Sequence, residues 1–146
     1  MANRSALDTL IELATTETDE AAKRLGLAIK AAAEIENKLK LLQDYRDEYA
    51  ARFELRTAAG LSAMGYSNFQ LFMGKLDTAV ASQQNLVNEA RKRVEERRAA
   101  WQLGERKRMS YNTLENRALE EEQKRDGKRE QKAMDEHAAR QYLYKR

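Results

Sequence analysis

Few side chains in this sequence have a type and spacing that could support catalysis. His137 is the single histidine and cysteine is absent, so the chain can build neither a catalytic histidine pair, nor a thiolate or multi-histidine metal site, nor a disulfide. Gly-Lys pairs begin at Gly74 and Gly127, but both lack the second glycine and the Ser or Thr of a phosphate-binding loop. The many carboxylates lie among Lys and Arg at helical spacing. We therefore expect no enzyme, no cofactor and no metal.

An apolar repeat, spaced four then three residues, runs in one phase from Leu7 to Phe53, with only Thr18 and Arg46 interrupting it. The same pattern resumes from Phe69 to Trp101 with two polar interruptions, Gln83 and Arg97. An average spacing of about 3.5 residues keeps one narrow seam facing a partner helix along its whole length. The sequence thus predicts an all-α fold, an antiparallel two-helix coiled-coil hairpin.

Composition supports long helices and constrains the cellular location. The chain has no proline, 35% charged and 42% hydrophobic residues, which is typical of paired helices and too apolar for disorder. Residues 1–90 carry 10 Lys and Arg against 13 Asp and Glu, whereas residues 91–146 carry 17 against 11. The basic character therefore belongs to the C-terminal third. We expect neither a secretion signal nor a membrane span, and a cytoplasmic location.

The pairing register follows from the repeat. Antiparallel helices pair residues whose numbers add up to a constant, and a constant of about 122 fits throughout. It places Phe53 opposite Phe69 and Ala21 opposite Trp101. The last partner on the second helix then lies near residue 119, so about 27 residues remain as a C-terminal helical overhang. Its nearly all-polar first part, residues 120–132, is typical of a solvated helix with charge pairs four residues apart, or of a frayed tail.

Local signals predict the element boundaries within a single domain, residues 1–146. The first helix spans about 3–58, with Asn3 or Ser5 as its N-cap. The loop spans about 59–67 and includes Gly60, which suits a left-handed helix end. The second helix spans about 68–141 and opens with a capping box made by Ser67 and Gln70.

Two apolar groups fall outside the seam and are candidates for partner contacts. Near the loop, the register brings Tyr45, Phe72 and Ala79 together beside the seam, where they form a partner surface or merely widen the seam. Near the C-terminus, Met134 and Tyr142 belong to a stripe that also contains Ala138 and has no partner in this register. This stripe either docks another molecule, folds back or is simply exposed.

Three segments together resemble the FliJ family, a small component of the flagellar type III export apparatus. They are Leu39–Tyr49, the Phe69–Phe72 segment with Leu76 and Ala79, and Gln131–Arg140. The single Trp101 and the opening segment Ala6–Leu10 also fall where the family would place them, so the resemblance spans essentially the whole chain.

The resemblance implies a hairpin similar to the central stalk of rotary ATPases. It implies binding to the hexameric flagellar export ATPase and promotion of its ring assembly. It also implies contact with the cytoplasmic domain of the transmembrane export-gate protein and binding of export chaperones. Through these partners the protein would sit peripherally at the cytoplasmic face of the inner membrane.

The resemblance also assigns residues to the two partner surfaces. The gate-binding surface would comprise Leu42, Tyr45, Tyr49, Phe72, Leu76 and Ala79. The ATPase-binding surface would comprise Leu7, Leu10, Gln131, Lys132, Met134, Asp135, Glu136 and Arg140.

Two other functional classes compete with this interpretation. The basic run from Arg91 to Arg108, with Trp101 and Tyr111 interleaved, is compatible with a nucleic-acid-binding arm. Glu95, Glu96 and Glu105 interrupt that run, so we favour a solvated helix face and expect no nucleic-acid partner. A purely structural homodimer is the other alternative, because a seam that pairs within a chain can also pair between chains.

Overall fold

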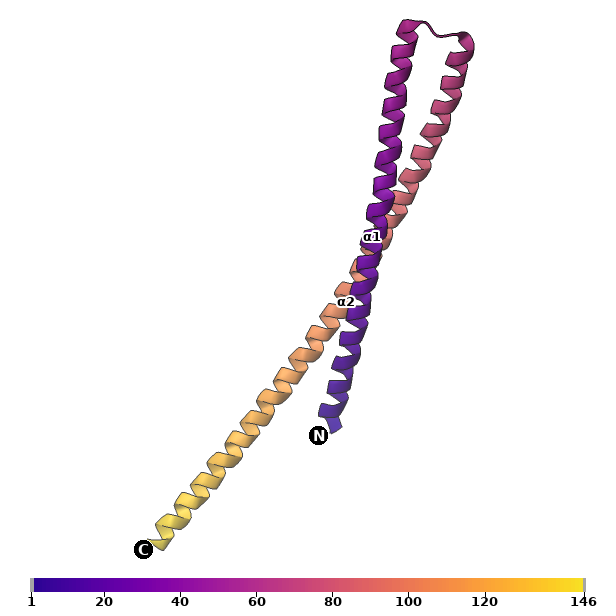
Figure 1. The fold of residues 1–146 in the computed structure, drawn as a ribbon. Coiled ribbons are helices and arrows are strands. Elements are labelled where there is room, and N and C mark those ends of the chain that lie inside the picture. The colour runs from indigo at the N-terminus through magenta and orange to yellow at the C-terminus, as the bar shows by residue number, and fades with distance from the viewer. Residues whose placement is uncertain (1, 146) are drawn as a thin grey trace. The chain divides into compact units, whose positions relative to one another are not determined.

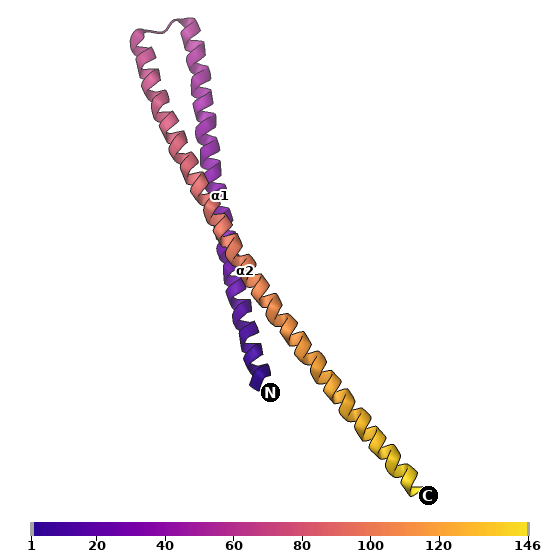
Figure 2. The same ribbon diagram turned by 180° about the vertical axis from the view of Figure 1, so that it is seen from behind.

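The structure, a computed structural model, describes the backbone of residues 2–145 and the side chains of residues 4–145. Two helices, α1 (Ala2–Ala59) and α2 (Ala63–Tyr144), account for nearly all of this range, which contains no strand. Figures 1 and 2 show from two sides the short connection that joins them. The helices pack against each other as a helical hairpin, which confirms the predicted all-α fold.

The contacts between the helices divide the chain into two units. The loop unit is Asp19–Gln102, and the terminal unit combines Met1–Thr18 with Leu103–Arg146. Both helices are continuous in sequence through both units. Each unit is described by itself below.

A tight reversal joins the helices in the loop unit. Gly60 has a φ of 95°, a left-handed backbone conformation that residues other than glycine rarely adopt. Its amide donates a hydrogen bond to the Thr57 carbonyl at 3.2 Å. Ser62 then caps α2, because its Oγ accepts from the Gly65 amide at 3.1 Å and its carbonyl accepts from the Tyr66 amide at 3.0 Å.

The predicted capping box at Ser67 is wrong, because α2 begins at Ala63 and Ser67 already lies inside it. Ser62 supplies the cap immediately after the Gly60 reversal, so the helix starts one turn earlier than predicted. The Gln70 side chain does not cap the helix. Its Nε2 donates a hydrogen bond to the Tyr66 hydroxyl at 3.0 Å. The loop is therefore shorter than predicted, and α2 ends at Tyr144 instead of residue 141.

Helix α1 begins at Ala2, away from the loop, and ends at Ala59, where the loop starts. Ser5 is not its N-cap, because it lies inside the helix and its carbonyl accepts from the Thr9 hydroxyl at 2.9 Å. The side chain of Asn3, the other predicted cap, lies outside the described residues.

The core of the loop unit is the predicted seam. Its buried residues, all of them positions of the apolar repeat, are Ala21, Ala32, Leu39, Leu76, Val87 and Ala90. Phe53 and Phe69 stack with ring centroids 3.5 Å apart, which confirms the predicted register near the loop. Half of these buried residues are alanines, so the seam buries little area per residue.

Two polar interruptions of the seam in the loop unit, Gln83 and Arg46, bind across to the opposite helix. Gln83 donates its Nε2 to the Ile35 carbonyl at 3.0 Å, and Arg46 forms an ion pair with Asp77. Neither side chain is left without a polar partner on reaching the seam. Such contacts add little stability when exposed.

In the terminal unit, the two helices approach each other closely at Gly104. Thr18 is only 2% exposed, and its Oγ1 donates to the Ala14 carbonyl at 2.7 Å. Gly104 of α2 packs directly on it: a Cβ built on Gly104 would lie 2.8 Å from the Thr18 Oγ1 and 3.5 Å from its Cα. The pair fits the predicted register and explains why Thr18 interrupts the repeat.

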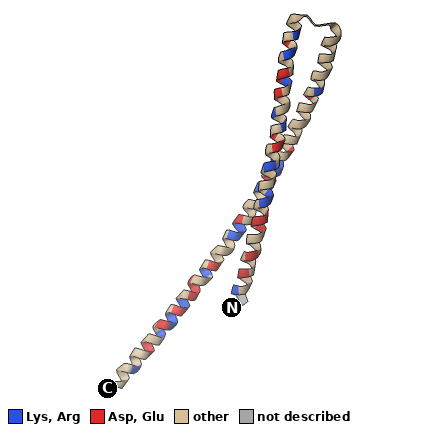
Figure 3. Ribbon diagram, viewed as in Figure 1, with Lys and Arg blue, Asp and Glu red and all other residues tan. Residues whose placement is uncertain are grey.

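Beyond Leu119, which is half-buried, every described residue of α2 is exposed. Residues 120–145 therefore form the predicted overhang. Figure 3 shows Lys and Arg alternating with Asp and Glu along this part of α2. The predicted charge pairs within it are wrong for the residues described: Glu122 pairs with Arg4 of α1 at 3.1 Å, and no ion pair joins two residues of the overhang. Fully solvated charges gain too little from pairing to fix long side chains.

The close approach at Gly104 predicts an unusual response to alanine. Alanine in place of glycine normally stabilises a helix by about 1 kcal/mol, but in Gly104→Ala the new methyl would collide with buried Thr18, at a cost of about 1–3 kcal/mol. We expect a lower melting temperature by circular dichroism. Gly74→Ala, whose methyl would meet no atom within 4 Å, is the matched control and should raise the melting temperature.

Removing the obstacle should restore stability to that variant. In Thr18→Ala combined with Gly104→Ala, the two methyl groups share the space that the threonine side chain now fills. The double variant should melt above Gly104→Ala alone. A Gly104→Ala protein as stable as Gly74→Ala would contradict the close approach.

Candidate partner-binding surfaces

Six aromatic rings gather in the loop unit, here called the aromatic cluster: Tyr45, Tyr49, Phe53, Tyr66, Phe69 and Phe72. The ring centroids of Tyr49 and Phe72 lie 4.6 Å apart, and Phe72 meets Tyr45 edge-on at 6.3 Å. Tyr49 also stacks on Phe69 at 5.2 Å. Such offset and edge-on arrangements are favourable beyond the area they bury. The structure thus brings together the three aromatic members of the predicted gate-binding set.

Members of that set differ in how far they reach the surface. Tyr45 is 47% exposed, whereas Leu42, Tyr49, Phe72 and Ala79 are half-buried. Leu76 is only 7% exposed and belongs to the core. Phe72 and Ala79 therefore widen the seam in part, while Tyr45 remains on the surface. Leu76 supports the set from beneath.

A shallow, mainly apolar hollow lies next to Tyr45. Its lining includes Leu42 and two residues that sequence reasoning missed, Lys38 and Leu41, together with Gln83 from α2. The hydrogen bond from Gln83 to the Ile35 carbonyl holds the amide at one wall. Leu41 lies four residues before Tyr45, one position outside the seam. That spacing was the available signal, because it places both side chains on one face of α1.

The second predicted set divides into two places within the terminal unit. Leu7 is half-buried on α1 and lines a groove together with Arg4, Leu119 and Arg125, whereas Leu10 is exposed and does not line this groove. All members on α2, from Gln131 to Arg140, lie in the exposed overhang. Gln131 is nine residues past Glu122, the partner of Arg4, or about 14 Å along the helix axis. The structure therefore does not join these two groups into one patch.

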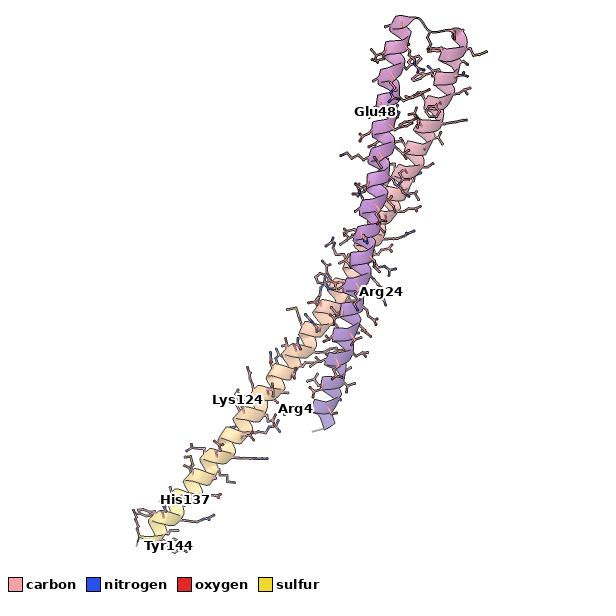
Figure 4. All side chains as sticks on the ribbon, viewed as in Figure 1. Arg4, Arg24, Glu48, Lys124, His137 and Tyr144 are labelled. Atoms are coloured by element: carbon pink, nitrogen blue, oxygen red, sulfur yellow. The ribbon has the colours of Figure 1, made fainter. Side chains whose placement is uncertain are left out.

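Figure 4 shows this arrangement through four labelled side chains of the terminal unit. Arg4 lies near the stretch of α2 that contains Lys124, while His137 and Tyr144 lie further along α2. The stripe predicted from Met134, Ala138 and Tyr142 is exposed in the overhang. Met134 and Ala138 are therefore not covered by the hairpin.

Gln131 and Asp135 are linked one helical turn apart, with Gln131 donating its Nε2 to an Asp135 carboxylate oxygen at 3.1 Å. Gly127, just before them, has open space where a Cβ would stand. The methyl group of an alanine in place of Gly127 would therefore meet no neighbouring atom within 4 Å.

Charged residues of the basic run are partly neutralised by neighbouring carboxylates. In the loop unit Arg91 pairs with Glu36 at 2.9 Å and Arg98 with Glu95 at 3.8 Å. In the terminal unit Arg108 pairs with Glu105 at 3.1 Å, and Arg108 Nε is buried without a hydrogen-bond partner. These pairs favour the interpretation of the run as a solvated helix face.

Among the described residues, no group of three or more His, Cys, Asp or Glu side chains is placed to hold a metal ion. Over the same range, neither helix has a stretch long and apolar enough to cross a membrane.

Comparison with known proteins identifies the family. The family model of the flagellar FliJ protein matches residues 3–146. The chain is 29% identical to the flagellar FliJ protein of Escherichia coli (strain K12) over 145 residues, which cover 99% of both chains. It is 28% identical to the flagellar FliJ protein of Salmonella typhi over the same length and share. A match of this extent, on a helical hairpin with the expected seam, shows that the chain belongs to the FliJ family of flagellar proteins.

Proposed function

We propose that this chain, as a component of the flagellar export apparatus, acts as a stalk between two partners. One partner is the hexameric export ATPase, whose ring assembly the chain would promote. The other is the cytoplasmic domain of the transmembrane export-gate protein. The chain would also escort export chaperones and would meet the membrane peripherally through its partners. This role requires two separate binding surfaces and no catalytic site.

The observation that carries the gate contact is the exposed edge of the aromatic cluster. Tyr45, braced by Tyr49 and Phe72, stands beside the hollow at Leu41. Aromatic side chains held by their neighbours lose little freedom on binding and are enriched among the residues that dominate binding energy. This part of the loop unit therefore has the properties of a protein-binding surface.

The ATPase contact is supported by the overhang. Its residues, 120–145, are exposed along their whole length, yet they carry an apolar stripe that contributes nothing to the hairpin. The groove between the start of α1 and α2 adds both charged and apolar groups nearby. A helix kept long without internal packing is readily explained by a partner that covers it.

Alanine variants of the aromatic cluster test the gate contact. In Tyr45→Ala and Phe72→Ala, affinity for the purified cytoplasmic domain of the gate protein should fall about 30-fold by calorimetry, as expected for aromatic residues central to an interface. The helical circular dichroism signal should not change for Tyr45→Ala, because this side chain lies at the surface. Leu27→Ala, an exposed leucine of the same unit outside the proposed surface, is the control and should bind normally.

A variant of the buried residue Leu76 tests whether Phe72 acts at the surface or in the core. Leu76→Ala should lower the melting temperature, because it opens a cavity in the core at a cost of about 2–5 kcal/mol. If Phe72→Ala loses as much thermal stability as Leu76→Ala, Phe72 is a core residue and the proposed gate contact loses its centre.

Truncation tests the ATPase contact. A chain ending at Leu119 should no longer co-purify with the ATPase or promote its hexamer, as measured by size-exclusion chromatography with light scattering. Its melting temperature should stay within a few degrees of the full chain, because the removed residues bury no core and lose one exposed ion pair worth about 0.5 kcal/mol.

A point variant narrows the effect to the stripe. Met134→Asp should weaken ATPase binding, whereas Leu103→Asp, an equally exposed apolar position before the overhang, should not. Normal hexamer assembly with the truncated chain would show that the overhang is dispensable and would refute this part of the proposal.

A further inference from the structure

The end of the hairpin has a composition unlike the rest of the chain. Although 35% of all residues are charged, none of the 18 residues from Thr57 to Gly74 is. This stretch contains the loop and the first turns of α2. Figure 3 shows the start of α2 as an uninterrupted uncharged segment. Charged residues normally keep an exposed helix soluble, so an exposed stretch of this length without any charge suggests a contact with another molecule.

Large apolar side chains of this region point into solvent. Met64 is 75% and Leu71 66% exposed. Seven residues separate them, so they lie on one face of α2 about 10 Å apart. Leu55 at the end of α1 and Tyr66 are also more than half exposed. We call residues 55–76 the tip. It includes Phe72 and Leu76 of the proposed gate-binding set, but its exposed apolar groups, Leu55, Met64, Tyr66 and Leu71, are not members of that set.

The few charges of the tip share one sign. Between residues 55 and 76 the only charged side chains are Arg56 and Lys75, one near each end. The nearest carboxylates are Glu54 and Asp77, and Asp77 is engaged by Arg46. The tip therefore presents uncharged apolar groups bordered by cations, with Tyr66 as an amphipathic aromatic residue between them.

We propose that the tip binds directly to the surface of a lipid bilayer that contains anionic lipids. Interfacial segments bury apolar side chains about 5–10 Å into the boundary between headgroups and acyl chains, while neighbouring Lys and Arg contact the phosphates. Met64 and Leu71 are the inserted groups, and Arg56 and Lys75 are the phosphate contacts. Tyr66 occupies the level of the headgroups, where tyrosine is favoured.

The asymmetry between the helices determines which one lies on the membrane. From the loop, α2 runs uncharged through Gly74, whereas α1 reaches Arg56 and Glu54 within its last two turns. The outer face of α2 is therefore the inserted face, and α1 limits the depth. With two apolar anchors and two cations the attachment is reversible and sensitive to salt. It is independent of the protein partners proposed above.

Fluorescence of the full chain tests insertion. In Tyr66→Trp combined with Trp101→Phe, the new tryptophan is the sole indole and reports on the tip. With vesicles of phosphatidylcholine and phosphatidylglycerol in equal parts, its emission should shift to the blue and be quenched by lipids brominated on the acyl chain. With pure phosphatidylcholine both changes should be much weaker. An emission spectrum unaffected by anionic vesicles would overturn the proposal.

Matched charge insertions locate the contact. By vesicle co-sedimentation, Met64→Glu and Leu71→Glu should lower the partition coefficient of the full chain at least about tenfold, through loss of an inserted apolar group and repulsion from the anionic surface. Leu27→Glu, the same change at an equally exposed leucine (68%) on α1, should keep at least half of the binding. Equal losses in all three variants, or binding that survives Leu71→Glu, would place the contact elsewhere and overturn the proposal.

Sedimentation velocity without lipid tests whether a second copy of the chain covers the tip. The wild-type chain should sediment independently of concentration at the concentrations used for the vesicle assay. Self-association that Leu71→Glu abolishes and Leu27→Glu preserves would show that the exposed apolar groups cover each other between chains, and the lipid contact would be rejected.

Discussion

Everything in this protein depends on one narrow apolar seam between two helices. Each helix can turn only one stripe of side chains toward the other, so the buried positions are few and mostly small, such as Ala14, Ala32 and Ala90. A chain folded in this way has no second layer that could cover further apolar groups. A large apolar side chain beyond the edges of the seam, such as Leu71, remains in water unless another molecule covers it. Exposed apolar residues therefore carry more functional meaning here than in a globular domain.

The polar interruptions of the seam give it a single register. A pattern of small and aliphatic residues alone permits the helices to slide by one heptad at modest cost. The fit of Gly104 on Thr18 is satisfied at one alignment only, and in that alignment Gln83 also donates to the Ile35 carbonyl. A shift by one heptad would place a side chain against Thr18 in place of Gly104. These residues add little free energy of folding, but they select one hairpin among similar ones.

Much of the fold could be predicted from the sequence because its periodicity is long. Dozens of residues in one phase outweigh any local signal, and the stacked pair Phe53 and Phe69 confirms the register inferred from that phase. The cap at Ser67 was predicted wrongly, since a capping box identifies a helix start only when the preceding residues are non-helical. Ser62 had already formed a helix start. Periodicity determines which residues face the partner helix over long distances, but it locates a helix terminus only to within about one turn.

The proposed binding surfaces were harder to predict for a related reason. Tyr45 and Phe72 could be placed together because the register relates positions on opposite helices. Leu41 and Lys38 were missed because the hollow they line depends on how side chains tilt at the edge of the seam, which spacing does not specify. The overhang could be delimited by elimination, from the point where α1 has no more residues to pair. Which molecule covers it is not encoded in periodicity.

The seam also explains how relatives can differ in most residues and still align end to end. Identities of 29% and 28% extend over 99% of each chain. One inserted residue in a helix would rotate everything beyond it by about 100° and carry the seam to the wrong face. Substitution at an outward position leaves the seam intact, so binding surfaces can change residue by residue. Length and phase are thus the properties that this fold must keep, while the proposed binding surfaces at the aromatic cluster, the tip and the overhang are free to change.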